Sequence, residues 1–480
     1  MALATKCALR YHLYLSPFTA RRLDGREMPD NLLTVILCEL GERMLAMREA
    51  LSDPSVASKP HARAVAGLLD GGIDGLEARL QRDVLLERRN DGAEGAEGAE
   101  GAEGVTPAVL DTLYQCGQAL RALHRRLGLL DMRWSAAPVD IFLRKLRDDV
   151  DVDPPHPAVV LSDDYAVLDS DVAASLQAAL RVSGVEMGAE AGADQVVALP
   201  RIEAADPLSW PLLLPALGRI MLSRQDDPRL DDRPGRQRGL RTVASDPATQ
   251  TLVAARLVGP AAFASVVTQS LLFTSPDNAT WTPPLWAVAT VTKAAAGGLE
   301  GGDPRVVAGG DGIVGALGRL LEARDKALGR AISSEWGTVG IDDNGWAALG
   351  LHAPDVPTPE ETAALLDKLV AGTPINAIDP PVPDDFLARL EGVDNPDDFY
   401  ALIGPLGERP ASLAAILGVG WLYKARYSYP LFGGLVEEYG DIGRVLSAYR
   451  PHLLERHGLL AQSIEAAHVQ GIFARGKAAE

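Results

Sequence analysis

Apolar side chains recur at helical spacing through much of this 480-residue chain, and this periodicity constrains the fold more than any single motif does. In residues 30–88 the apolar positions fall three or four residues apart, and a second stripe of this kind follows in 107–149. Further stripes run over 413–423 and 442–473. A helix with one apolar face must bury that face against other elements. The sequence therefore predicts a predominantly α-helical protein.

Two short β-branched runs interrupt the helical pattern. Residues 158–161 and 195–199 have the composition of strands, and they flank a segment with helical character at 171–183. They predict a small sheet directly ahead of the apolar segment from Asp206 to Leu222. The predicted fold class is thus α+β, predominantly α-helical.

Residues 90–104 contain Gly-Ala-Glu four times in succession. Glycine raises the entropy cost of ordering this tract, and the glutamates repel one another, so a flexible insertion is expected. We predict three parts in the chain: an N-terminal helical region at 1–150 that holds the insertion, a core at 151–375, and a C-terminal helical extension at 376–480.

The segment from Asp206 to Leu222 resembles the active-site helix of a group of largely uncharacterised bacterial zincin-like proteins. In that family a His-Glu-x-x-His motif places two zinc ligands one helical turn apart, beside a glutamate that activates water. The matching residues of the frame are Pro207, Leu208, Trp210, Pro211, Leu212, Leu213 and Gly218. The resemblance extends over about residues 195–470 and implies a zincin-like core. The alternative is an ordinary apolar core helix that follows a proline turn.

The metal-binding positions of the family are degenerate in this chain. The two histidines and the glutamate of the motif fall on Pro215, Ala216 and Arg219. Proline and alanine offer no donor atom, and a guanidinium repels a cation. Two acidic positions of the family's next helix fall on Pro247 and Thr251. The resemblance therefore implies no catalytic residues, no catalytic metal and no cofactor.

Two enzyme hypotheses remain as alternatives. Gly310, Gly312 and Gly315, in the loop 309–315, match a dinucleotide fingerprint in which backbone amides approach phosphate. The apolar run before this loop is short, however, and a glycine-rich connection into a helix explains the same residues. The other alternative is a metal site assembled from distant histidines. His452 and His457 are five residues apart, which predicts different sides of one helix.

Composition excludes several classes of function. The formal charge of −19 argues against a nucleic-acid groove and against an anionic membrane surface. The three cysteines suit neither a disulfide framework nor a zinc knuckle. No apolar run has the length of a signal peptide or of a membrane span. A cytoplasmic protein is expected.

These observations predict a catalytically inactive metalloprotease-like protein that acts as a structural or protein-interaction component. A bacterial conflict, secretion or injection assembly is one setting for it. We expect a protein partner, and neither nucleic acid nor a membrane. The aromatic segment from Tyr423 to Phe432 is the best candidate for a surface that faces the partner. The alternative for this segment is a helix end packed on the main body.

Overall fold

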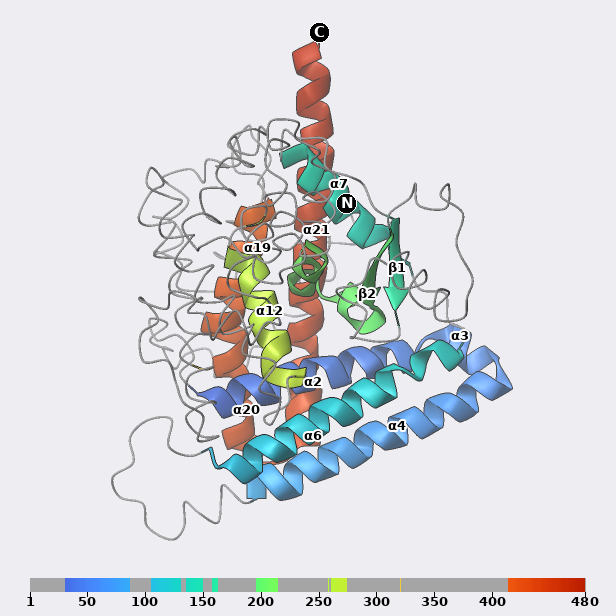
Figure 1. Ribbon diagram of the computed structural model, residues 1–480, viewed down its shortest axis with the longest axis vertical. Coiled ribbons are helices and arrows are strands. Elements are labelled where there is room, and N and C mark those ends of the chain that lie inside the picture. The colour runs from blue at the N-terminus through green and yellow to red at the C-terminus, as the bar shows by residue number, and fades with distance from the viewer. Residues whose placement is uncertain are drawn as a thin grey trace, which may run out of the picture.

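The computed structural model describes residues 31–86, 105–130, 135–149, 158–162, 196–214, 258, 260–273, 320 and 413–479. These residues form a mostly helical structure with one small parallel sheet, which confirms the predominantly helical α+β class (Figure 1). Within them, no helix combines the length and the apolarity needed to cross a membrane.

Helix α2 (Leu32–Leu51) lies at the centre of the structure. The Asn31 side chain caps its first turn by accepting a hydrogen bond of 3.1 Å from the amide of Thr34. Fourteen of its 20 residues are buried, so the helix has little solvent-facing surface. Helices on several sides cover it: α4, α6, α12, α20 and α21. A helix buried on nearly all sides must satisfy every polar group that it carries.

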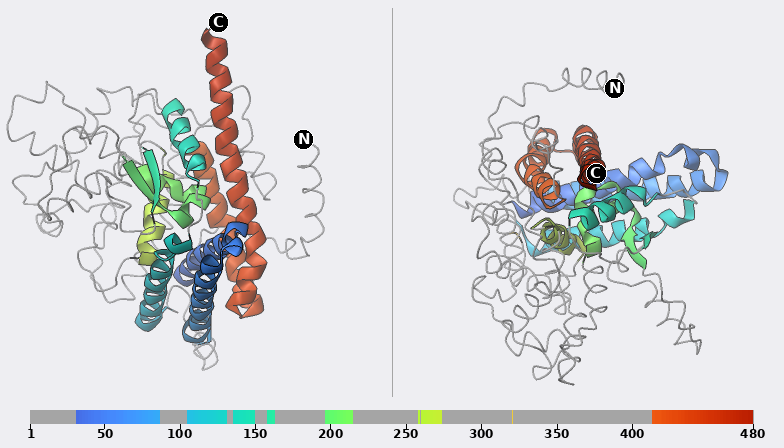
Figure 2. Two further views of the ribbon diagram at one scale, coloured as in Figure 1. Left: turned by 90° about the vertical axis from the view of Figure 1, so that its right-hand side faces the viewer. Right: turned by 90° about the horizontal axis from the view of Figure 1, so that it is seen from above.

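Two further N-terminal helices lie beside α2 (Figures 1 and 2). The short helix α3 (Pro54–Ser58) leads into α4 (Pro60–Leu80), which continues as a π-helical turn, η2 (Gln81–Leu85). Helix α6 (Pro107–His124) packs against α4. The helices predicted over 30–88 are thereby confirmed. The insertion predicted at 90–104 lies outside the described residues.

The second helical stripe, predicted over 107–149, is divided in the structure. Helix α6 ends at His124, a short 3-10 helix η3 (Leu127–Leu130) follows, and α7 (Ala137–Asp149) forms a separate helix. The break lets α7 leave the α4–α6 layer and pack on the C-terminal helix α21 (Ile442–Ala479).

The two predicted strands pair in a parallel sheet. Strand β1 (Ala158–Ser162) lies beside β2 (Val196–Pro200), with Ala158 opposite Val196. The helix predicted at 171–183 lies outside the described residues. Strand β2 leads directly into two 3-10 helices, η6 (Arg201–Ala205) and η7 (Pro207–Leu213). The apolar segment after Asp206 therefore begins as a buried 3-10 helix.

Trp210 anchors η7 in the core. Its indole Nε1 donates a hydrogen bond of 3.1 Å to the carbonyl oxygen of Ala204, and its ring meets Phe142 of α7 edge to face at 5.8 Å. The η7 segment also packs on α12 (Pro260–Phe273). The polar edge of the indole is thus satisfied locally while the ring fills the space between elements.

The C-terminal helices cross α2 and complete its burial (Figures 1 and 2). Helix α19 (Leu413–Tyr423) continues through a π-helical turn, η12 (Lys424–Ser428), into α20 (Tyr429–Tyr439). The chain then turns at Gly440, whose φ of 58° suits glycine, and enters α21. The predicted helix at 413–423 is confirmed, and α21 covers the one predicted at 442–473.

Gln81 of η2 ties this turn to the N-terminal helices. Its side-chain Nε2 donates to the carbonyl oxygen of Gly440 at 2.7 Å, and its Oε1 accepts from the amide of Ile442 at 2.9 Å. One side chain therefore satisfies two backbone groups at the corner between α20 and α21. The three-part division of the chain stays a prediction, but described residues of all three parts share a single apolar core.

The prediction of a partner-facing surface at Tyr423–Phe432 is wrong. Tyr423, Lys424, Ser428, Tyr429 and Phe432 are all buried. The aromatic rings pack between α2 and α21, where they line the polar groups described below. The alternative, a helix end packed on the main body, is the one that the structure supports.

Gly41 allows the C-terminal helices to pack closely against the backbone of α2. A Cβ atom at this position would lie 2.7 Å from Leu446 Cδ2 and 3.1 Å from Phe432 Cε2. We expect Gly41→Ala to destabilise the protein by about 1–3 kcal/mol, because the core must shift to admit a methyl group. Urea unfolding measures the effect.

Gly71→Ala is the matched control, since Gly71 is an exposed glycine inside α4, and a methyl group added there would have no other atom within 4 Å. There the higher helix propensity of alanine should leave stability unchanged or raise it by up to ~1 kcal/mol. Equal effects at the two positions would contradict close packing at Gly41.

Candidate functional site

The buried centre of α2 carries three charged side chains. Glu39, Glu42 and Arg43 are 1%, 4% and 6% exposed. Their i, i+3 and i+4 spacing places them close together along the helix. Burial of a charge is costly unless the charge is paired and hydrogen-bonded. These three residues belong to a group of charged side chains that we call the buried charge cluster. Its other members are Glu203, Asp206, Lys424 and Arg456.

Both oxygens of Glu42 are occupied by groups of the protein. Arg456 of α21 donates from Nη1 to Oε1 and from Nη2 to Oε2, each at 2.9 Å. Tyr449 donates to Oε1 at 2.7 Å, and Lys424 Nζ lies 2.9 Å from Oε2. Burial alone would raise the pKa of Glu42, but Arg456 and Lys424 hold it well below the ordinary value. Glu42 is therefore an anion with a complete set of donors.

Glu39 completes the pairing of Lys424. It accepts a 2.8 Å contact from Arg43 and a 2.7 Å hydrogen bond from Tyr429, and it forms an ion pair with Lys424. Burial would lower the pKa of Lys424, but Glu39 and Glu42 raise it above its ordinary value. Lys424 therefore stays charged, and its ammonium group also lies 5.2 Å from the ring centroid of Trp421.

Arg43 extends the cluster toward η6 and α12. Its Nε donates to Glu203 Oε1 at 2.8 Å, and Gln269 Nε2 donates to the same oxygen at 2.9 Å. Three elements that are far apart in sequence thus meet through one buried guanidinium and one buried carboxylate.

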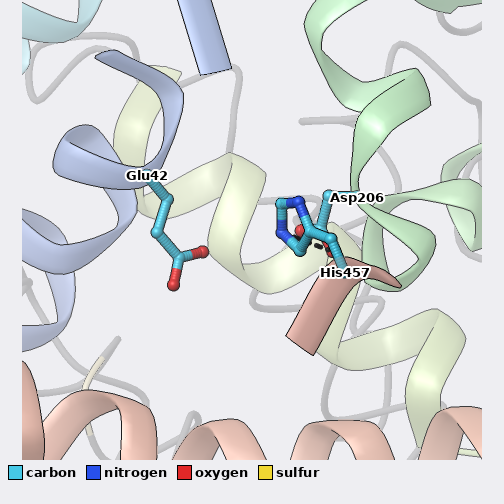
Figure 3. A group of neighbouring side chains, drawn as sticks. All are labelled: Glu42, Asp206 and His457. Atoms are coloured by element: carbon cyan, nitrogen blue, oxygen red, sulfur yellow. Dashed lines mark ion pairs between the residues drawn. The ribbon is translucent and has the colours of Figure 1, made fainter. Parts of the chain in front are cut away.

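Asp206 and His457 form the other edge of the cluster (Figure 3). Asp206 caps η7 by accepting from the amide of Leu208 at 3.0 Å, and its Oδ1 lies 3.4 Å from His457 Nε2. Burial would raise the pKa of Asp206, but His457 and Arg456 lower it. Burial lowers the pKa of His457, with Asp206 acting in the opposite direction. Arg456 Nη2 lies 3.3 Å from the same imidazole nitrogen.

His452 occupies a neighbouring place on α21 but has different partners. Its ring stacks on Tyr423 at 5.5 Å, and its Nε2 lies 2.9 Å from Ser428 Oγ. Burial lowers its pKa to about 3, and Arg456 acts in the same direction. The predicted placement on different sides of one helix agrees with these separate contacts. Both histidines are partly buried, and each lies within hydrogen-bonding distance of a neighbouring side chain.

The geometry does not favour a metal ion at this cluster. Ligand atoms of Glu42, Asp206 and His457 lie within 4.8 Å of one another, a set that a divalent ion could use. Each oxygen of Glu42, however, already has two donors, which use its lone pairs. A metal ion there would have to displace Lys424 or Arg456 and would lie close to whichever remained. The lysine and the arginine already supply the positive charge that a metal would bring.

The site residues predicted from the sequence cannot be compared with this cluster. The degenerate metal positions Pro215, Ala216, Arg219, Pro247 and Thr251 lie outside the described residues. The loop 309–315, with Gly310, Gly312 and Gly315, also lies outside them. The alternative of a metal site assembled from distant histidines stays a prediction, since among the described residues the candidate ligand set holds one histidine, His457, beside two carboxylates.

The cluster itself was missed from the sequence. The signal was the Glu-Leu-Gly-Glu-Arg run at 39–43 inside an otherwise apolar helix, which admits an exposed polar face as readily as buried charges.

Comparisons with protein families, with curated proteins and with solved structures found no match to this chain.

Substitution of Glu42 tests whether the cluster is structural. Glu42→Gln leaves Arg456 and Lys424 without their shared anion, so we expect a loss of about 3–5 kcal/mol in the free energy of unfolding. In a double-mutant cycle, Arg456→Met in the Glu42→Gln background should cost less than it does in the native chain. Urea unfolding of the four proteins provides the measurement.

Glu49→Gln serves as the control, because Glu49 lies on the same helix and pairs with Arg450 of the same partner helix at the surface. An exposed ion pair contributes less than about 1 kcal/mol. A cost at Glu42 no greater than the cost at Glu49 would show that the buried pairs do not hold α2 to α21.

Proposed function

We propose that this protein is a non-catalytic structural or protein-interaction component. The observation that carries the proposal is the complete occupation of Glu42 by Arg456, Lys424 and Tyr449. A catalytic acid or base needs a position within reach of substrate. Here the group best placed to do chemistry is engaged on both oxygens by the protein itself.

Two further groups beside Glu39 and Glu42, the Cys38 thiol and the Tyr429 hydroxyl, are held in their protonated forms. Burial raises the pKa of the Cys38 thiol well above its ordinary value, and the nearby Glu42 adds to this effect. The nucleophile at cysteine is the thiolate, so Cys38 is inert near neutral pH. Burial and Glu39 likewise raise the pKa of Tyr429, whose hydroxyl keeps its proton and donates a hydrogen bond to Glu39. This pattern supports a role in folding and packing.

The zincin-like core remains part of the proposal. Its support is the sequence resemblance around Asp206, together with the small sheet that directly precedes this segment. The absence of donor atoms at Pro215 and Ala216 supports an inactive member of such a family. A cytoplasmic location and a role in a bacterial conflict, secretion or injection assembly belong to the same proposal.

A protein partner is supported by the far end of α21. Val469, Ile472 and Phe473 are 42%, 49% and 69% exposed. Their i, i+3 and i+4 spacing places them on one side of the helix. Figure 1 shows this end of α21 projecting beyond the labelled elements. An exposed apolar stripe of this kind is a common feature of protein–protein contacts.

Activity measurements with added metal test the non-catalytic proposal. We expect the purified protein to cleave neither casein nor a mixed peptide library in the presence of zinc. The triple variant Pro215→His, Ala216→Glu and Arg219→His restores the three family positions, and we expect it to bind zinc more tightly than the native chain does if the zincin-like frame is retained. Chelator-sensitive cleavage by the native protein would overturn the proposal.

A further inference from the structure

Two imidazoles sit in the interface between α21 and the rest of the protein. His452 contacts Tyr423 at the end of α19 and Ser428 in η12, while His457 faces Asp206 at the start of η7. The His457 side chain is only 12% exposed. Both residues therefore contribute to packing in the neutral form, and each faces a different part of the surface that α21 covers.

The charges around these imidazoles come from several elements. Arg456 lies on α21 itself, Glu42 on α2, Asp206 at η7 and Lys424 in η12. Among the described ion pairs, the buried charge cluster joins three carboxylates to three permanent cations: Glu39, Glu42 and Glu203 with Arg43, Lys424 and Arg456. Glu39, Glu42 and Glu203 are thus paired with permanent cations before either histidine takes up a proton, whereas Asp206 has His457 as its ion-pair partner.

Among the described residues, no anion would be in direct contact with a proton on His452. In the described part of the chain its hydrogen-bonding and ring partners are Tyr423, Ser428 and Tyr449, and none of them is negatively charged. The imidazolium would lie one helical turn from the Arg456 guanidinium in a buried setting. Such a charge is destabilising unless the segment moves toward water.

A proton on His457 would meet opposing neighbours. Asp206 Oδ1 at 3.4 Å favours it, but this separation exceeds the 2.7–2.9 Å typical of a charge-assisted hydrogen bond. Arg456 Nη2 lies at 3.3 Å and opposes it. With both histidines protonated, residues 452–457 would carry three cations: the buried Arg456 and the partly buried His452 and His457.

We propose that His452 and His457 form an acid-released latch, which holds α21 against α19, η12 and η7 at neutral pH and loosens these contacts when both imidazoles are protonated, while the Glu42–Arg456 pair still joins α21 to α2. The latch regulates the accessibility of α21, which is also the helix whose far end carries the exposed apolar stripe. It depends on the buried contacts of α21 and stands whether or not the non-catalytic proposal holds.

The direction of the pH dependence follows from the two environments of the imidazoles. Both have lowered pKa values in the folded protein, and that of His452 falls to about 3. Their contribution to stability is therefore complete above the ordinary histidine pKa of about 6.5 and is lost as the pH falls toward the folded-state values. Glu42 and Asp206, whose pKa values are lowered, remain charged through most of this window.

Hydrogen exchange of the full chain at pH 6.5 to 4.5 tests the latch, after correction for the intrinsic exchange rate. We expect protection to fall in α21, α19 and η12 while α4 and α6 stay protected. Each linked proton increases the opening equilibrium about tenfold per pH unit, so two protons give up to about a hundredfold. A uniform loss of protection, or a rise well below tenfold per unit, would overturn the proposal, and this measurement needs no variant.

Substitutions then assign the protons. His452→Phe keeps an aromatic ring against Tyr423, and His457→Gln keeps a polar group near Asp206, but neither residue can titrate. We expect the double variant to open at a pH at least one unit lower than the native chain does. His61→Gln, at an exposed position on α4, is the matched control and should leave the native opening pH unchanged. An unchanged opening pH in the double variant, or a shift of the native opening pH by EDTA, would refute the latch.

Discussion

The bidentate pair between Glu42 and Arg456 is the interaction on which the arrangement of the helices depends. It joins the centre of α2 to the centre of α21, and Lys424 brings the α19–α20 connection to the same carboxylate. Dehydration of these charges is costly, so the pair is weak evidence for high stability. The pair instead selects one register of α21 on α2, because other registers would leave buried charges without partners. The apolar contacts around it have no such directional requirement.

The glycine at position 41 makes this pairing sterically possible. It lies one residue before Glu42 and allows Leu446 and Phe432 to approach the backbone of α2. Tyr429 and Tyr449 then reach Glu39 and Glu42 with their hydroxyl groups while their rings remain in the apolar core. Aromatic residues with a polar edge thus form the boundary between the charged centre and the hydrocarbon that surrounds it.

Local periodicity was sufficient to predict most of the described helices and both strands. The helix at 413–423 and the strands near 158 and 196 agree closely with the structure, because their patterns depend on neighbouring residues. The division of 107–149 after His124 was missed, since an apolar stripe does not reveal a change of direction. None of the site positions inferred from the zincin resemblance falls among the described residues.

The charge cluster was inaccessible to the same reasoning for a physical reason. A glutamate in a helical sequence is usually solvated, and only its tertiary partners make it a buried ion. Those partners lie 390 positions away for Tyr429 and 414 for Arg456. The segment Tyr423–Phe432 was misjudged for the same reason, because its aromatic and basic residues suit an exposed surface until their acidic partners are known.

The separation of 414 residues between Glu42 and Arg456 has a consequence for biosynthesis. At ribosomal rates of about 5–20 residues per second, α2 emerges on the order of tens of seconds before the segment that neutralises it is made. During that interval a helix destined for the centre of the protein has a charged middle and apolar flanks but no permanent neighbours. The carboxylates that later orient α21 can keep the nascent helix hydrated, which would lower its tendency to aggregate before the chain is complete.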